Sequence, residues 1–145
     1  MLKRFRHIRN LGSSTRFDAG DYFCYAKKIA GQLDASAVSL LDEDRYIPGG
    51  PRTLWRSILR SMSFSNDQLH LRFESADSRR SFAFNYSDVR RVLAPEARLC
   101  AMPTLIVQEL TLVRGNVLRH ALADLGGDVW LIYAKDLTFV EQQLH

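Results

Sequence analysis

The hydrophobic pattern of this chain changes from a helical period to a period of two, and this change limits what the chain can fold into. Leu69, Leu71 and Phe73 alternate with polar residues, as Phe82 and Phe84 do after a short polar loop. Strict alternation is typical of a strand that buries one face. Similar runs continue to about residue 140, separated by short turns. We therefore predict an antiparallel meander of about six to eight strands over residues 58–140.

The N-terminal part of the chain predicts helices instead. Asp18 is a good N-cap residue, and the apolar residues after it lie on one helical face. These residues are Tyr22, Ala26, Ile29, Ala30 and Leu33. A helix over 18–33 and a second short helix that ends before Pro48 would cover the apolar face of the strands. The sequence thus predicts an α+β fold, with helices at about 18–47 packed on the meander in a single domain over 18–145.

Length and composition fit one globular domain. The chain has 145 residues, of which 46% are hydrophobic and 25% are charged, and these values are ordinary for soluble proteins. It has no apolar run long enough for a transmembrane helix, so we expect no membrane span. Its two cysteines, Cys24 and Cys100, are isolated from one another. This usage indicates a reducing compartment, and we expect two small buried thiols in a cytoplasmic protein.

A basic arm at residues 1–17 carries the positive charge of the chain. Its basic residues are Lys3, Arg4, Arg6, Arg9 and Arg16. The whole chain is +4, but five of its 20 basic residues and none of its 16 acidic residues lie in the arm, so the remainder is almost neutral. Three interpretations stay open. The arm is a first strand or helix with solvated charges, a segment that contacts phosphates, or, in a eukaryote, a mitochondrial targeting segment.

The segment 52–64 fits two structures with different functional meanings. As a helix, it would place three arginines on one face, which suits nucleic acids and anionic surfaces. These are Arg52, Arg56 and Arg60. As a strand, it would point Ile58, Met62 and Phe64 inward. The turn residues 65–67 lead directly into the next strand, so we divide the segment into a helix or loop to about Ser57 and a strand from there.

No catalytic or metal-binding pattern is found in the sequence. None of the four histidines has a His, Cys or paired carboxylate at a metal-ligand spacing, so we predict no metal site and no cofactor. Nucleophile motifs of hydrolases and a βαβ crossover are also missing, which favours a protein that is not an enzyme. His120 shares a strand face with Leu118 and Leu122, so it is a core or edge histidine or, alternatively, a general base or ligand contact. Glu109 and Arg119 fit a cross-strand ion pair.

The order of the expected elements resembles that of small bacterial α+β proteins of unknown function. The resemblance covers about residues 20–140: N-terminal helices, a strand from Ile58, a Ser-Asn-Asp turn, a Leu-x-Leu-x-Phe strand and the later runs 109–112 and 118–120. Some proteins of this type act as immunity or accessory proteins beside toxins, so the resemblance implies a protein partner. They usually carry a Leu-His-Asp triplet before the first strand, where this chain has residues 54–57, Leu-Trp-Arg-Ser.

These observations lead to three hypotheses of function. The first is a non-catalytic, cytosolic interaction module, of immunity or accessory type, that presents a sheet face or edge to a protein partner. Its candidate contacts are Trp55, Arg56, Arg60, His120, Trp130 and Tyr133. The second is binding of an anion or nucleic acid, for which the candidates are Lys3, Arg4, Arg6, Arg9 and Arg52, together with Arg56 and Arg60. The third is a small-ligand pocket between helices and sheet, lined by His120 and Trp130. The oligomeric state stays open.

Overall fold

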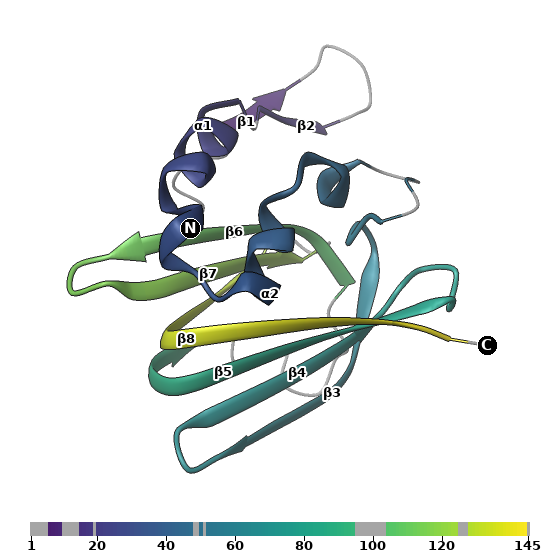
Figure 1. Ribbon diagram of the computed structural model, residues 1–145. Helices are drawn as coiled ribbons and strands as arrows, with labels where there is room; N and C mark the ends of the chain where they lie inside the picture. Colours follow the sequence, from purple (N-terminus) through teal and green to yellow (C-terminus); the bar gives the residue numbers. More distant parts are fainter. Residues whose placement is uncertain are drawn as a thin grey trace.

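The computed structural model describes residues 6–9, 15–18, 20–47, 50, 52–94, 104–124 and 128–144. Within these ranges the fold is mostly β, and its main body is a closed antiparallel barrel of six strands in the order β3-β4-β5-β8-β7-β6 (Figure 1). The strands are β3 (Ser57–Ser65), β4 (Gln68–Glu74), β5 (Arg80–Leu93), β6 (Thr104–Val113), β7 (Val117–Asp124) and β8 (Val129–Gln143). A separate two-stranded sheet pairs β1 (Arg6–Arg9) with β2 (Thr15–Asp18).

The predicted α+β fold, with helices packed on a meander, is therefore wrong. Consecutive strands are antiparallel neighbours within β3-β4-β5 and within β6-β7-β8, but β5 pairs with β8 and not with β6. The sheet closes because β3 pairs with β6. Register shifts in β3, β5 and β6 help to explain the closure, because bulges bend and twist a strand. Alternation of hydrophobic residues shows that one face of a strand is buried. It does not show whether a helix or the opposite wall of the same sheet buries it.

The barrel interior is filled by the alternating residues of its strands. Phe82, Phe84 and Tyr86 of β5 are at most 2% exposed. Phe84 packs edge-on against Phe73 of β4, with 5.6 Å between ring centres, and tilts against Phe139 of β8 at 5.2 Å. The residues between them on β5, such as Ala83 and Asn85, are only half-buried. The sequence pattern thus identifies correctly which side of these strands faces the core.

The helical segment is short and irregular. It contains α1 (Gly20–Ile29), α2 (Ala35–Val38) and the 3-10 turns η1 (Ala30–Gln32), η2 (Ser39–Leu41) and η3 (Glu43–Tyr46). The expected helix over 18–33 starts later, because Asp18 is the last residue of β2, and it ends as a 3-10 turn. Asp34 caps α2 as expected from the sequence, since its Oδ1 accepts a hydrogen bond from the N–H of Ser36 at 2.9 Å. Figure 1 shows α1 beside β6 and α2 above β8.

The ambiguous segment 52–64 contains no helix. Residues 52–56 form a loop and turn, and β3 starts at Ser57. At its far end, Asn66 and Asp67 both adopt positive φ angles, of 52° and 58°. This conformation is the type I′ turn that joins twisted antiparallel strands most readily.

Candidate interaction surface

The barrel is closed by a very short seam between β3 and β6. The two strands pair only at Ser57 with Leu105 and at Ile58 with Thr104. The N–H of Arg56 adds one hydrogen bond to the carbonyl of Leu105, at 2.7 Å. Within the described residues no further pair joins the strands. The rest of β6 and the rest of β3 therefore each have an edge that the barrel does not pair.

The free edge of β6 is covered by helix α1. The hydroxyl of Tyr22 accepts from the N–H of Leu110 at 2.9 Å and lies 3.3 Å from its carbonyl oxygen. Tyr25 repeats this arrangement on Leu112, with distances of 2.8 Å and 3.4 Å. Burial raises the pKa of Tyr22 to about 12, so its hydroxyl keeps the proton that it donates. Two tyrosines thus satisfy backbone groups that a neighbouring strand would otherwise bond.

No residue that the structure describes covers the free edge of β3 in this way. Every residue from 60 to 68 is exposed, and Met62 and Phe64 are 47% and 57% exposed. Their partners across β4 are Leu71 and Leu69, which are both buried. Met62 and Phe64 therefore stand on the face that continues the barrel interior, but at a place where the barrel has no opposite wall. We call residues 60–65 the β3 edge; β3 is the lowest strand in Figure 1.

The side chains of the β3 edge do little to prevent another strand from pairing with it. Natural edge strands usually carry lysines, prolines or inward-pointing charges that block pairing. Residues 61–65 read Ser-Met-Ser-Phe-Ser and contain none of these. The bulge near Arg60 is the one protective feature, and this arginine lies 3.6 Å from Glu74 of the neighbouring strand. The sequence predicted that Met62 and Phe64 point inward, but it did not show that they are exposed.

The other predicted contact residues are spread over the molecule. Trp55 is half-buried and Arg56 exposed in the loop before β3, while Tyr133 is half-buried on β8. His120 and Trp130 lie inside the barrel, with 0% and 4% exposure. The void that Trp130 lines measures only about 10 Å³, too small for a ligand, and His120 does not line it.

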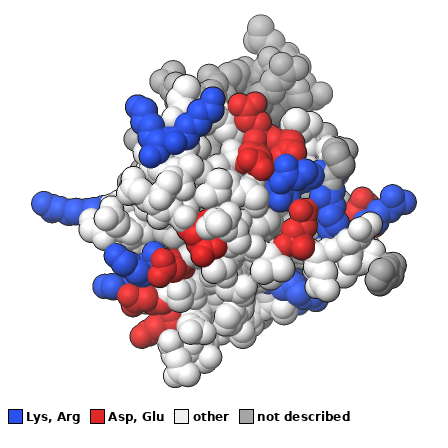
Figure 2. Space-filling view, in the orientation of Figure 1, with Lys and Arg blue, Asp and Glu red and all other residues white. Residues whose placement is uncertain are grey.

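The predicted anion-binding residues do not form one described basic surface. Arg52 bonds to Asp44 at 2.8 Å and to Asp42 at 3.1 Å, so two carboxylates neutralise it. Lys3 and Arg4 lie outside the described residues, while Arg6 and Arg9 belong to β1. Figure 2 shows Lys and Arg side chains next to Asp and Glu, with no broad area of one sign on the visible face.

His120 belongs to a chain of hydrogen bonds in the core. Its Nε2 lies 2.6 Å from Oε1 of Gln108, and its Nδ1 lies 2.6 Å from the hydroxyl of Tyr86. Because an amide oxygen only accepts, Nε2 must carry the proton, and Nδ1 then accepts from Tyr86. Gln108 in turn donates to the carbonyl of Leu40 at 2.9 Å and to the hydroxyl of Tyr46 at 2.6 Å. Burial lowers the pKa of His120 to about 3, which keeps the ring neutral.

Two further expectations concern buried groups. Glu109 and Arg119 do form an ion pair, 3.6 Å from Oε1 to Nη1, but as diagonal neighbours on β6 and β7. Both side chains are almost completely buried. Cys24, which we expected in the core, is exposed on α1, because it lies on the side of the helix opposite Tyr22 and Ala26. Cys100 lies outside the described residues.

Comparisons with known proteins assign no family. No protein-family model matches the chain, and no curated protein is significantly similar to it. Within the described ranges, no three His, Cys, Asp or Glu side chains gather closely enough to hold a metal ion. None of the described helices is long and apolar enough to cross a membrane.

Proposed function

We propose that this protein is a non-catalytic interaction module that binds an extended segment of a protein partner along the β3 edge. The observation that supports this proposal is the difference between the two edges at the seam. Tyr22 and Tyr25 cover the β6 edge, whereas residues 60–65 are exposed. An exposed edge that carries no charge over residues 61–65 is a template for strand addition.

The partner segment would add a strand to the sheet beside β3. Backbone N–H and C=O groups of alternate residues on the edge supply hydrogen bonds, which provide affinity for any extended chain. Met62 and Phe64 offer an apolar face that favours a partner with apolar residues at every second position, since cross-strand pairs stabilise a sheet. Ser61, Ser63 and Ser65 lie on the other face of β3 and are small enough to let a partner strand approach.

Site-specific crosslinking in native lysate tests this proposal. A photo-reactive phenylalanine analogue is placed at Phe64 in the full chain, and in a second protein at Val140, which is also apolar and 52% exposed. Val140 is a matched control because β8 pairs with β5 at this position and its other edge is covered by α2, where the N–H of Phe139 donates to Oγ of Ser36 at 3.0 Å. We expect a discrete protein adduct from position 64 and none of the same mass from position 140.

A charge on the edge provides the second arm of the experiment. Met62→Lys places a protective lysine on the β3 edge and is expected to abolish the adduct from position 64. Val140→Lys places the same charge elsewhere and leaves the adduct unchanged. Both positions are about half exposed, so both variants keep the fold. Equal adducts from positions 64 and 140, or an adduct from position 64 that survives Met62→Lys, would overturn the proposal.

A further inference from the structure

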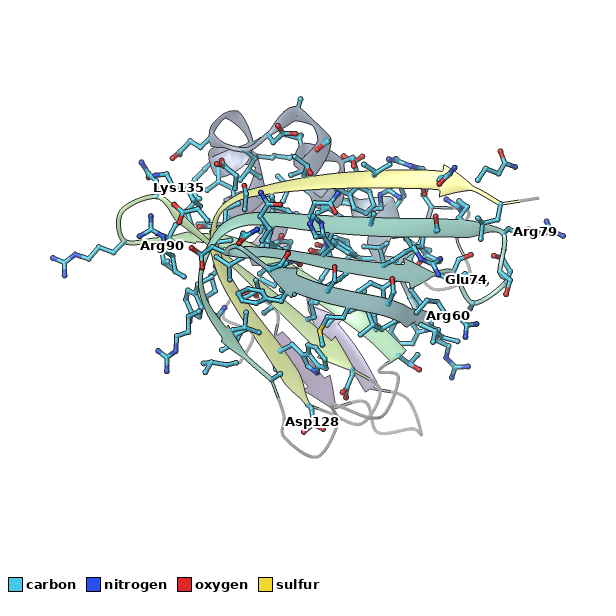
Figure 3. All side chains as sticks on the ribbon, turned by 90° about the horizontal axis from the view of Figure 1, so that it is seen from below. Arg60, Glu74, Arg79, Arg90, Asp128 and Lys135 are labelled. Carbon is cyan, nitrogen blue, oxygen red and sulfur yellow. The ribbon has the colours of Figure 1, made fainter. Side chains whose placement is uncertain are left out.

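A second surface feature, separate from the β3 edge, is an open groove of about 340 Å³ at one end of the barrel. It lies between the loop before β3 and the turn from β4 to β5. Trp55 and Arg56 line it from the loop, and Ser75, Asp77 and Arg80 line it from the turn. Its volume falls at the lower end of the range found for small-molecule sites. Figure 3 shows Arg79, which belongs to this turn, at the end of the barrel opposite Arg90.

The Arg80 wall of the groove carries an excess of positive charge. Arg80 and Arg45 both bind Oε2 of Glu141, at 2.8 Å and 2.9 Å from their Nη1 atoms. Arg45 also reaches Oε1 at 3.3 Å, so it takes both oxygens of the carboxylate. One carboxylate therefore serves two guanidinium groups. Arg80 keeps N–H donors that Glu141 does not use, because a guanidinium has five.

Arg56 supplies a second positive charge, and its backbone is held in an unusual conformation. Its φ angle is 62°, in the left-handed region that residues other than glycine seldom adopt. The N–H of Arg56 bonds to the carbonyl of Leu105, and the N–H of Ser57 bonds to that of Leu54 at 3.1 Å. The side chain is exposed and forms no ion pair with any residue that the structure describes. Such strained residues cluster at binding sites.

Asp77 does not cancel these charges by direct contact. Its Oδ1 accepts from the hydroxyl of Ser75 at 2.6 Å and from the N–H of Arg79 at 3.0 Å, so it is occupied within its own turn. Of the charged groups at the groove and the network behind it, Arg45, Arg56 and Arg80 are positive, whereas Asp77 and Glu141 are negative. An anion that enters the groove therefore meets two guanidinium groups beside a half-buried indole ring.

We infer that this groove binds a small organic anion. Arg56 and Arg80 would hold its carboxylate or phosphate by charge-assisted hydrogen bonds. The planar apolar part of the ligand would pack on Trp55, as aromatic rings do in binding sites. This inference does not depend on the β3 edge, and the two sites are tested with different variants.

Titrations followed by NMR test the groove with defined probes. The full chain is titrated with phenyl phosphate, benzoate, inorganic phosphate and benzyl alcohol, and the indole N–H signals of Trp55 and Trp130 are observed. We expect the Trp55 signal to shift with phenyl phosphate or benzoate, while the signal of the buried Trp130 stays in place. A comparison of these two probes shows whether the groove prefers a phosphate or a carboxylate. Inorganic phosphate lacks the aromatic ring, and benzyl alcohol lacks the negative charge. Each is therefore expected to bind at least about tenfold more weakly than the aromatic anions.

Two conservative variants decide whether the arginine contact is specific. Arg56→Gln removes an exposed charge from the groove and is expected to raise Kd for the bound probe about tenfold, the value of one charge-assisted hydrogen bond. Arg90→Gln removes an exposed arginine at the other end of the barrel and leaves Kd unchanged. The inference is overturned if no probe shifts Trp55 at about 10 mM, a concentration that detects even millimolar affinity. It is also overturned if both variants weaken binding equally, or if inorganic phosphate binds as tightly as the aromatic anions.

Discussion

The hydroxyl of Tyr22 lies against both backbone polar groups of Leu110, 2.9 Å from the nitrogen and 3.3 Å from the carbonyl oxygen. A side chain from a helix thus takes the place of a neighbouring strand. Tyr25 does the same two residues further along β6. The contact explains how a barrel with a seam of only two residue pairs remains stable. It also covers the β6 edge of the seam, whereas residues 60–65 of β3 are exposed.

Tyr22→Phe is expected to destabilise the protein by about 1–3 kcal/mol, because it leaves the N–H of Leu110 buried without its partner. The ring itself, which is fully buried, is retained, so the core keeps its packing. Urea unfolding measures the difference. Tyr133→Phe is the matched control, since Tyr133 is half-buried and forms no hydrogen bond that the structure assigns. Equal stability of the two variants would contradict the role of the Tyr22 hydroxyl.

The buried His120 makes stability depend on pH. In the unfolded chain it takes up a proton below about 6.5, but in the folded protein its pKa is about 3. The unfolded state therefore binds more protons between these values. The stability is complete above about pH 6.5 and decreases as the pH falls toward 3, by at most about 1.4 kcal/mol per pH unit from this residue.

Nitrogen NMR and acid unfolding check this behaviour. At pH 5 we expect His120 to give the signals of a neutral ring with the proton on Nε2, as its bonds to Gln108 and Tyr86 require. In Tyr86→Phe, Nδ1 loses its donor, and the stability falls by about 1–3 kcal/mol. A ring that titrates near its ordinary pKa in the folded protein would show that the core around His120 is open to water.

Local patterns in the sequence predict the strands well, but not the way in which the sheet closes. The alternation of Phe82 and Phe84 depends only on neighbours in the same strand, so it is visible in the sequence. Closure depends on Ser57 meeting Leu105, and no local signal marks two residues so distant in the chain. The helices were expected to cover the whole apolar face. They are too short for this, and the opposite wall of the barrel does it instead.

The candidate sites, too, can be predicted only in part from local patterns in the sequence. Trp55 and Arg56 were selected from the sequence because of their residue types, and both line the groove. Arg80 was not selected, and its carboxylate partner Glu141 lies 61 residues away. A cluster assembled from distant segments has no spacing that a motif search could detect. The β3 edge was missed for a related reason, since exposure of Met62 depends on the absence of an opposite strand.

The turn between β3 and β4 offers a prediction about stability. Asn66 and Asp67 both have positive φ angles, and glycine is the preferred residue at the second position of such a turn. Asp67→Gly is expected to raise the free energy of unfolding by about 0.5 kcal/mol, because relief of the left-handed conformation exceeds the added flexibility of the unfolded chain. Gln68→Gly, one residue later in an exposed strand position, should lower it by about 0.5–1 kcal/mol. Thermal unfolding compares the two, and a loss of stability in both variants would contradict the type I′ assignment.

Glu141 is expected to be the most sensitive surface carboxylate, because it neutralises a buried charge. The Arg45 side chain is only 2% exposed, and it also donates to the carbonyls of Ser39 and Arg52 at 3.3 Å and 3.2 Å. These two bonds remain in Glu141→Gln, so we expect a loss of about 2 kcal/mol rather than unfolding. Asp88→Asn breaks the exposed pair with Arg90 and should cost at most about 0.5 kcal/mol.

The pH dependence of the stability of Glu141→Gln separates the effect of the lost charge from an effect on packing. Burial of Glu141 acts to raise its pKa, but the hydrogen bonds and charges of Arg45 and Arg80 outweigh it and hold the pKa below its ordinary value. The unfolded carboxyl therefore takes up its proton first as the pH falls. The stabilisation is present above the ordinary pKa and is lost as the pH falls through the lowered one. The stability difference between the wild type and Glu141→Gln should thus shrink in acid, and a constant difference would show that the variant acts through packing instead.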